Sequence, residues 1–233
     1  AAPLAAYGER MKECGIDRAV LVHPEPYGDD HCLVLDCLRR DPQRFVGTSL
    51  FYPDDPDGPQ RLADLVASQP RIVATRFHAH RGKEEYIGSF ADAGVVALWR
   101  KAAELGLIVE LHIGPNYAAQ VAERIEDFPE TPVLIDHLAE PHMGTAVEYA
   151  HVLDLGAYDN VYMKLSGLNH FAVDGPHFES AKPFTSRVIE SFGPRRLVWG
   201  SGTPAVVDVH MAAYSEEDKA LVKGENLKAM LRF

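Results

Sequence analysis

The fold is decided by residues 107–138, which read LIVELHIGPNYAAQVAERIEDFPETPVLIDHL. Two apolar runs, 107–112 and 132–137, each end in a histidine and flank a segment with helical periodicity. This order is typical of a strand–helix–strand unit in a parallel sheet. Side chains at the carboxyl ends of parallel strands face the loops where such folds carry their chemistry. We therefore expect His112 and His137 to lie at the functional edge of the sheet.

A single histidine at a strand end is more often a satisfied structural residue than a functional one. Two equivalent histidines in successive units favour function, because imidazole suits both metal binding and proton transfer near neutral pH. We therefore take His112 and His137 as the candidate catalytic residues.

The same strand–helix unit recurs along the whole chain. The predicted strands are 19–23, 45–51, 72–78, 107–112, 132–137, 160–166 and 196–202. The main predicted helices are 4–14, 31–40, 60–68, 90–105, 117–128, 143–155, 184–192 and 216–233. This repetition predicts an α/β fold, a (β/α)8 TIM barrel whose first strand is missing or lies upstream of Ala1, with an open sheet as the alternative. We expect one domain over residues 1–233.

The charge and composition of the chain restrict which partners and which cell compartment we expect. The formal net charge is -11, so nucleic acid and anionic membranes are not expected partners. No apolar run reaches the roughly 18 residues of a membrane span, and no signal peptide is visible. The three cysteines, Cys14, Cys32 and Cys37, show no CxxC spacing and read as reduced thiols, so we expect a cytoplasmic protein.

Cationic side chains end two of the predicted strands. Arg76 and His78 project to one side of the strand 72–78, and Lys164 lies near the end of the strand 160–166, on the same side as Ser166. A charged side chain in an apolar strand is costly unless it meets an anion. We therefore expect Arg76, His78 and Lys164 to bind a small substrate that carries a carboxylate.

Loops that follow strands supply further candidates. His23 and Tyr27 follow the first predicted strand and are expected to line the mouth of the site. His170 and His177 lie in the long loop 167–183, which could form a lid, although histidines in surface loops are usually solvated.

Five segments, taken in order, resemble the amidohydrolase-related (amidohydrolase-2) family of TIM barrels. They are Glu110–Gly114, Ile135–Pro141, Val161–Gly167, Leu197–Pro204 and Lys223–Leu227. The resemblance covers nearly the whole chain from Ile16 onward. Each segment alone is weak, whereas five in the right order form a fairly specific set.

The resemblance implies a fold, a cofactor and a choice of reactions. The family contains metal-dependent hydrolases, lactonases and non-oxidative decarboxylases of aromatic acids, and its members often pair, so a homo-oligomer is possible. By resemblance, His112 corresponds to a metal ligand and His137 to a histidine that binds metal or moves a proton. Zinc is the metal expected. The string Lys164–Gly167 is more similar to the lactonase branch.

Two departures from the family pattern affect the metal. A His-x-His pair on a first strand is absent, and His78-Ala79-His80 has that spacing on a different strand. Gly202 stands where the family has an Asp, so His112 and His137 supply only two donors. Glu110 could replace the missing ligand, although a carboxylate at that depth would more often pair with a cation inside the barrel.

These observations support three hypotheses. The first is a hydrolase of a small anionic substrate, most plausibly a lactone or related ester or amide, with water activated by a divalent metal or by a histidine base. The second is a metal-dependent decarboxylase of an aromatic or related acid, for which Tyr27, Phe77 and Phe171 are the candidate wall residues. The third is an inactive barrel that binds a ligand, a reading favoured by Gly202.

Overall fold

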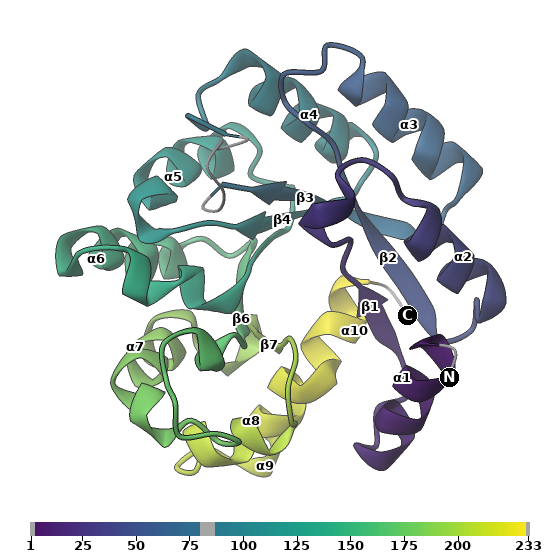
Figure 1. Cartoon of the computed structure of the whole chain (residues 1–233). Coiled ribbons are helices and arrows are strands. Elements are labelled where there is room, and N and C mark those ends of the chain that lie inside the picture. The colour runs from purple at the N-terminus through teal and green to yellow at the C-terminus, as the bar shows by residue number, and fades with distance from the viewer. Residues whose placement is uncertain (1–2, 80–86, 232–233) are drawn as a thin grey trace.

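A computed structural model describes residues 3–79 and 87–231 of the chain. In these residues, seven parallel strands pair strictly in chain order, from β1 to β7. The strands are β1 Ala19–Leu21, β2 Phe45–Leu50, β3 Ile72–His78, β4 Ile108–His112, β5 Val133–Ile135, β6 Val161–Leu165 and β7 Leu197–Trp199. Figure 1 shows that the sheet curls around a centre with helices on its outside. The TIM-barrel class predicted from the sequence is confirmed as a curled, barrel-type parallel sheet.

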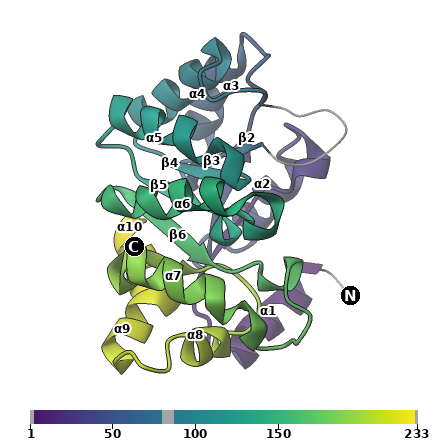
Figure 2. The same ribbon diagram turned by 90° about the vertical axis from the view of Figure 1, so that its left-hand side faces the viewer.

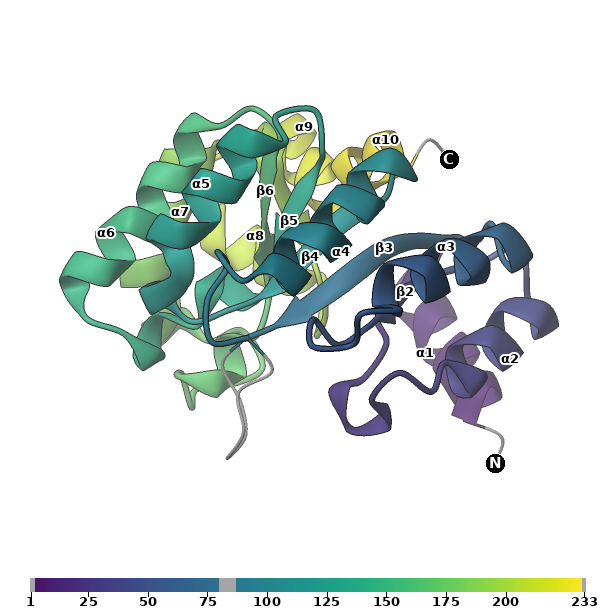
Figure 3. The same ribbon diagram turned by 90° about the horizontal axis from the view of Figure 1, so that it is seen from above.

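Helices alternate with the strands, as the repeat predicts. They are α1 Pro3–Glu13, α2 Cys32–Arg40, α3 Gly58–Ser68, α4 Ala93–Glu104, α5 Ala118–Asp127, α6 Ala146–Asp154, α7 Lys182–Phe192, α8 Ala205–His210, α9 Glu216–Ala220 and α10 Asn226–Met230. The predicted single helix over 216–233 is instead broken by a π-helical turn, Leu221–Glu225, between α9 and α10. Figures 2 and 3 show α3 to α7 as one outer layer along the strands.

Burial explains why these runs form strands. Every residue of β2 and β4 is buried, which is the pattern of a parallel strand covered on both faces. The outward faces pack against the helices in one large core that includes Phe90 and Trp99, both fully buried. No helix in residues 3–79 or 87–231 is long and apolar enough to cross a membrane.

The inward faces of the strands carry two layers of different chemistry. A lower apolar layer packs against Leu227 and Met230, which belong to α10. This layer consists of Ala74, Ile108, Leu134 and Val198. Because strand side chains alternate with a period of two, the next inward positions lie one layer closer to the carboxyl edge. Three of them are Arg76, Glu110 and Asp136, so the apolar layer forms the floor on which the polar site rests.

Candidate active site

Two cations and two carboxylates form a buried network above the apolar layer. We call Arg76, Glu110, Asp136 and Lys164 the charged layer. Arg76 Nη2 lies 2.7 Å from Asp136 Oδ2, and Lys164 Nζ lies 2.6 Å from Asp136 Oδ1. Lys164 also donates to Glu110 Oε1. All four residues are buried, so each charge depends on the others for its compensation.

Burial and ion pairing have opposite effects on the pKa values of the two carboxyl groups. Burial by itself raises the pKa of Asp136, but Lys164 and Arg76 hold that pKa well below its usual range. Burial raises the pKa of Glu110 even though Lys164 opposes it. Asp136 is therefore the firmly ionised carboxylate of the charged layer, and it is the one that touches both cations.

Four imidazoles lie above the charged layer in an arc. This histidine arc consists of His78, His112, His137 and His170, with neighbouring ring centroids 4.5, 5.0 and 5.0 Å apart. His78 and His112 occupy paired positions on β3 and β4, which explains their stacked rings. His78, His112 and His137 were expected here from the sequence. The structure thus brings together residues from three adjacent strand ends and one loop.

His112 is held at both of its ring nitrogens. Arg76 Nη2 lies 2.9 Å from Nδ1, and Glu140 Oε1 lies 2.8 Å from Nε2. A guanidinium group only donates hydrogen bonds, so Nδ1 must accept and a neutral His112 carries its proton on Nε2. His112 therefore donates to Glu140.

A left-handed turn places two of the site residues. The four residues from His137 to Glu140 all have positive φ, between 48° and 58°, although none is glycine. Such conformations cost free energy and persist where the surroundings enforce them, often at functional sites. The turn follows β5 directly and brings both ends of the segment, His137 and Glu140, into contact with the histidine arc.

Gly167 makes room for this turn. It has a φ of +68°, and a Cβ added there would lie 2.5 Å from Cβ of His137. Any larger residue at this position would therefore have to displace His137.

His137 is a neutral member of the histidine arc. Its Nδ1 lies 2.9 Å from Ser166 Oγ, and within the described part of the chain no hydrogen bond engages its Nε2. Burial lowers the pKa of His137 to about 4, and the cations Lys164 and Arg76 also oppose its protonation while Asp136 favours it. At neutral pH this ring is an uncharged imidazole with one nitrogen available to a ligand.

Three donors for a metal ion lie close together, but a hydrogen bond from Arg76 already fixes one of them. His112, His137 and Glu140 each offer a ligand atom, and these atoms lie within 4.8 Å of one another. Three protein ligands are what a catalytic zinc site uses. However, a metal at Nε2 of His112 would need that nitrogen unprotonated, which would turn Nδ1 into a donor that faces the donor Nη2 of Arg76. The three donors could therefore hold a metal ion only in competition with the hydrogen bond between Arg76 and His112.

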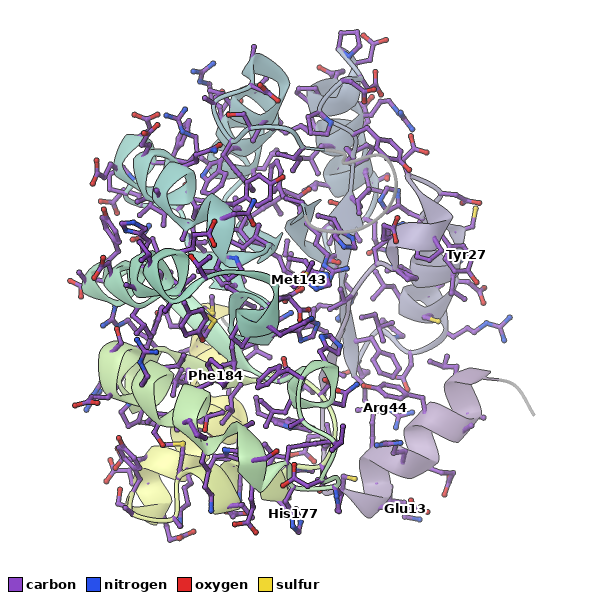
Figure 4. All side chains as sticks on the ribbon, turned by 60° about the vertical axis from the view of Figure 1, so that its left-hand side comes forward. Glu13, Tyr27, Arg44, Met143, His177 and Phe184 are labelled. Carbon is purple, nitrogen blue, oxygen red and sulfur yellow. The ribbon has the colours of Figure 1, made fainter. Side chains whose placement is uncertain are left out.

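Other residues named from the sequence lie in different surroundings. His23 is buried, its ring centroid lies 4.5 Å from that of His31 in a tilted arrangement, and its Nε2 donates to the carbonyl oxygen of Gly28. Tyr27 is 52% exposed beside α2, and His177 lies far from it, at the lower edge of Figure 4. His80 lies outside the described residues.

Gly202 contributes open space. It has a φ of +84°, and among residues 3–79 and 87–231 no heavy atom beyond its two chain neighbours lies within 4 Å of the position that a Cβ would take. The alternative ligand Glu110 pairs with Lys164, which is the interior cation considered from the sequence.

Sequence reasoning missed Glu140 and undervalued His170. Glu140 is fully buried and lies 2.8 Å from a ring nitrogen of both His112 and His170. Its position three residues after His137 gave no signal, because the left-handed turn that directs it inward cannot be read from non-glycine residues.

Comparisons with known proteins agree with this architecture. Residues 1–232 match the family described as amidohydrolase, and the chain belongs to that family. It is 28% identical over 205 residues to a 4-sulfomuconolactone hydrolase of Hydrogenophaga intermedia, which covers 87% of this chain and 65% of the relative. It is also 28% identical over 205 residues to an L-fucono-1,5-lactonase of Burkholderia ambifaria, covering 83% of this chain and 67% of the relative. The chain thus spans about two thirds of the length of these relatives.

A solved structure shows the same fold. It is that of a probable 2-pyrone-4,6-dicarboxylic acid hydrolase from Acinetobacter baumannii, with citric acid bound. The TM-score is 0.81 at 20% sequence identity, and the match covers 100% of this chain and 90% of that chain.

Proposed function

We propose that this protein hydrolyses a lactone that carries a carboxylate or a similar anionic group. The observation that carries the proposal is a neutral, partly exposed His137, held by Ser166 above a buried layer of paired charges. The similarity to two relatives named as lactone hydrolases supports the same class of substrate.

The chemistry fits an ester that is opened by water. Attack of water on the carbonyl carbon places negative charge on the carbonyl oxygen, and preorganised positive charge stabilises that transition state. Arg76 and Lys164 lie beneath the histidine arc and provide such charge, although each is also paired with Asp136. We propose that the positive charge of Arg76 and Lys164 stabilises the developing oxyanion and the substrate anion across the histidine arc. His78 occupies the end of this arc at β3.

His112 and His137 are the proposed catalytic residues that face the reacting group. His112 is fixed as a donor toward Glu140, whereas Nε2 of His137 can contact the carbonyl group or the attacking water. Tyr27 at the surface and the buried His23 remain proposed for substrate binding.

Zinc is the competing proposal for activating the water. It follows from the family resemblance and requires His112 to release its contact with Arg76, so that its Nε2 becomes a ligand. Analysis of bound metal in the purified protein distinguishes the two proposals.

The decisive experiment is product analysis with a panel of carboxylate-bearing lactones. We expect uptake of water with release of one acid equivalent per ring opened, followed by pH-stat titration and mass spectrometry. Release of CO2 from an aromatic acid would support the decarboxylase instead, and tight binding without turnover would support the inactive barrel.

A variant pair ties the activity to this site. His137→Asn should lower kcat by about 100-fold or more, the usual scale for a lost proton-transferring or polarising imidazole. His151→Asn alters an exposed histidine on α6 and should leave kcat unchanged. Equal activity of both variants would contradict the proposed site.

A further inference from the structure

His170 reaches the histidine arc from a loop. It ends the short 3-10 helix Leu168–His170 that follows β6, and its ring centroid lies 5.0 Å from that of His137. Its Nδ1 lies 2.8 Å from each oxygen of Glu140. The side chain of Glu140 is fully buried, whereas that of His170 is 23% exposed. The pair thus joins a buried carboxylate to an imidazole that borders solvent.

The contacts of Glu140 indicate which ring nitrogens of His112 and His170 carry protons. His112 donates to Glu140 through Nε2, as its contact with Arg76 requires. An ionised carboxylate only accepts hydrogen bonds, so Nδ1 of His170 is also a donor to it. In the tautomer with its proton on Nδ1, the lone pair of the His170 ring lies on Nε2. Among the described residues, no hydrogen bond engages that nitrogen.

We propose that Glu140 and His170 form a carboxylate–imidazole dyad that acts as the general base in lactone hydrolysis, with Nε2 of His170 accepting the proton of the attacking water. This inference rests on the proposed function and assigns the base within the same site. A carboxylate bonded to Nδ1 holds the ring in the tautomer that leaves Nε2 basic, and it stabilises the imidazolium that forms.

Electrostatics favours His170 over His137 for this role. An imidazolium at His170 would form 2.8 Å from a carboxylate oxygen. The Nδ1 of His137 instead lies 2.9 Å from Ser166 Oγ, and a hydroxyl stabilises an imidazolium less than a carboxylate does. His170 is therefore the proposed base, and His137 contacts the carbonyl group that water attacks.

The dyad takes one proton from water and returns it to the leaving oxygen. The oxygen of water forms a bond to the carbonyl carbon, and one water proton passes to Nε2 of His170. When the tetrahedral intermediate collapses, the bond between the carbonyl carbon and the ring oxygen breaks. The same proton then moves from Nε2 to the leaving oxygen, which becomes the hydroxyl of the opened product.

The variant His170→Asn tests the base directly. The side-chain amide of Asn places an N–H donor near the position of Nδ1, so the contact with Glu140 is kept while Nε2 is lost. A second variant, Glu140→Gln, removes the charge of the carboxylate. The matched control is His142→Asn, because His142 lies 3.7 Å from Glu140, beyond hydrogen-bond distance, and its side chain is 40% exposed.

Hydrolysis of a lactone that the wild type turns over is measured in water alone and with hydroxylamine. We expect His170→Asn to lower kcat by about 100-fold or more with little change in KM, and Glu140→Gln to lower it in the same direction. Hydroxylamine is a stronger nucleophile than water and needs less help from a base. The His170→Asn variant should therefore recover ring opening as the hydroxamate, and His142→Asn should resemble the wild type throughout.

Different outcomes separate the inference from the proposed function. Full hydrolytic activity of His170→Asn would overturn the dyad. So would a loss of activity that hydroxylamine does not restore in a variant with a wild-type melting temperature, because a binding or structural role would then explain the loss. A wild-type protein that opens no lactone would instead contradict the proposed function, and the dyad would fall with it.

Discussion

Arg76 donates a hydrogen bond from Nη2 to Nδ1 of His112 over 2.9 Å, and this contact decides which nitrogen of His112 carries the proton. The other nitrogen, Nε2, then donates to Glu140. Arg76 therefore keeps His112 in the tautomer that does not bind a metal through Nε2.

The first prediction concerns metal binding by an Arg76→Met variant. Removing the guanidinium frees His112 to carry its proton on Nδ1, so we expect the variant to bind more zinc than the wild type, measured by elemental analysis after dialysis against zinc. The wild type should hold well below one zinc ion per chain.

Arg71→Met is the matched control, because Arg71 binds the carbonyl oxygen of Phe45 instead of a site residue. Stoichiometric zinc in the wild type that disappears in His112→Ala would contradict this account of the tautomer.

The second prediction concerns Lys164, which compensates both Glu110 and Asp136. Lys164→Met should lower the free energy of unfolding by about 3–5 kcal/mol, because it leaves buried carboxylates without their cation. Lys223→Met removes a half-exposed pair with Asp208 and should cost about 1 kcal/mol or less. Urea unfolding measures both.

The double variant Glu110→Gln with Lys164→Met should recover part of this loss, since one of the stranded charges is gone. Equal unfolding free energies for Lys164→Met and Lys223→Met would argue against a stabilising charged layer.

The third prediction compares two glycines with the same positive φ. Gly167 and Gly106 both have a φ of +68°, but of the two only Gly167 would bring a Cβ against another side chain, that of His137. Alanine at either position should cost about 1–2 kcal/mol for the positive φ. We expect Gly167→Ala also to lower kcat at least tenfold, whereas Gly106→Ala keeps its kcat. A kcat that is the same in both variants would show that displacement of His137 does not matter.

The fourth prediction concerns stability in acid. Burial is the main reason that the pKa of His31 falls to about 4, and Nε2 of His31 accepts the backbone N–H of Leu50. The unfolded chain, with a histidine pKa of about 6.5, binds more protons than the folded chain between these values. Stability should therefore fall as the pH is lowered from about 6.5 to about 4.

His31→Gln keeps an acceptor for the N–H of Leu50 but cannot titrate. It should remove on the order of 2 kcal/mol of this acid-induced loss, since a tenfold change in proton affinity corresponds to about 1.4 kcal/mol. Melting temperatures recorded across this pH range measure the effect, with the exposed His151→Gln as control. An unchanged slope in His31→Gln would remove His31 as its origin.

The strands could be predicted from the sequence because the residue pattern that marks a strand is local. Apolar runs that end in polar residues predicted all seven described strands, and the alternation of side chains placed Arg76 and His78 on one face. Pairing partners are not local. Arg76 and Asp136 are 60 residues apart, and their contact depends on the curl of the sheet. The predicted mouth and lid residues likewise depended on loop paths that residue types do not fix.

The site residues that sequence reasoning missed depend on unusual backbone. Ala139 and Glu140 adopt positive φ without being glycine, so nothing in their identity indicates a left-handed turn. His170 was weighed as a solvated loop histidine, which is the commoner case, and only the path of the chain after β6 brings it to Glu140.

The charged layer also bears on how the chain matures during its synthesis. Glu110 leaves the ribosome 54 residues before Lys164, its cation, and Asp136 also precedes that lysine. Before Lys164 has been synthesised, Arg76 is the single cation of the charged layer that is available to two carboxylates. Burial of both carboxylates at that stage would leave negative charge uncompensated, which is strongly unfavourable. Stable closure of this layer is therefore expected only after β6 has been made.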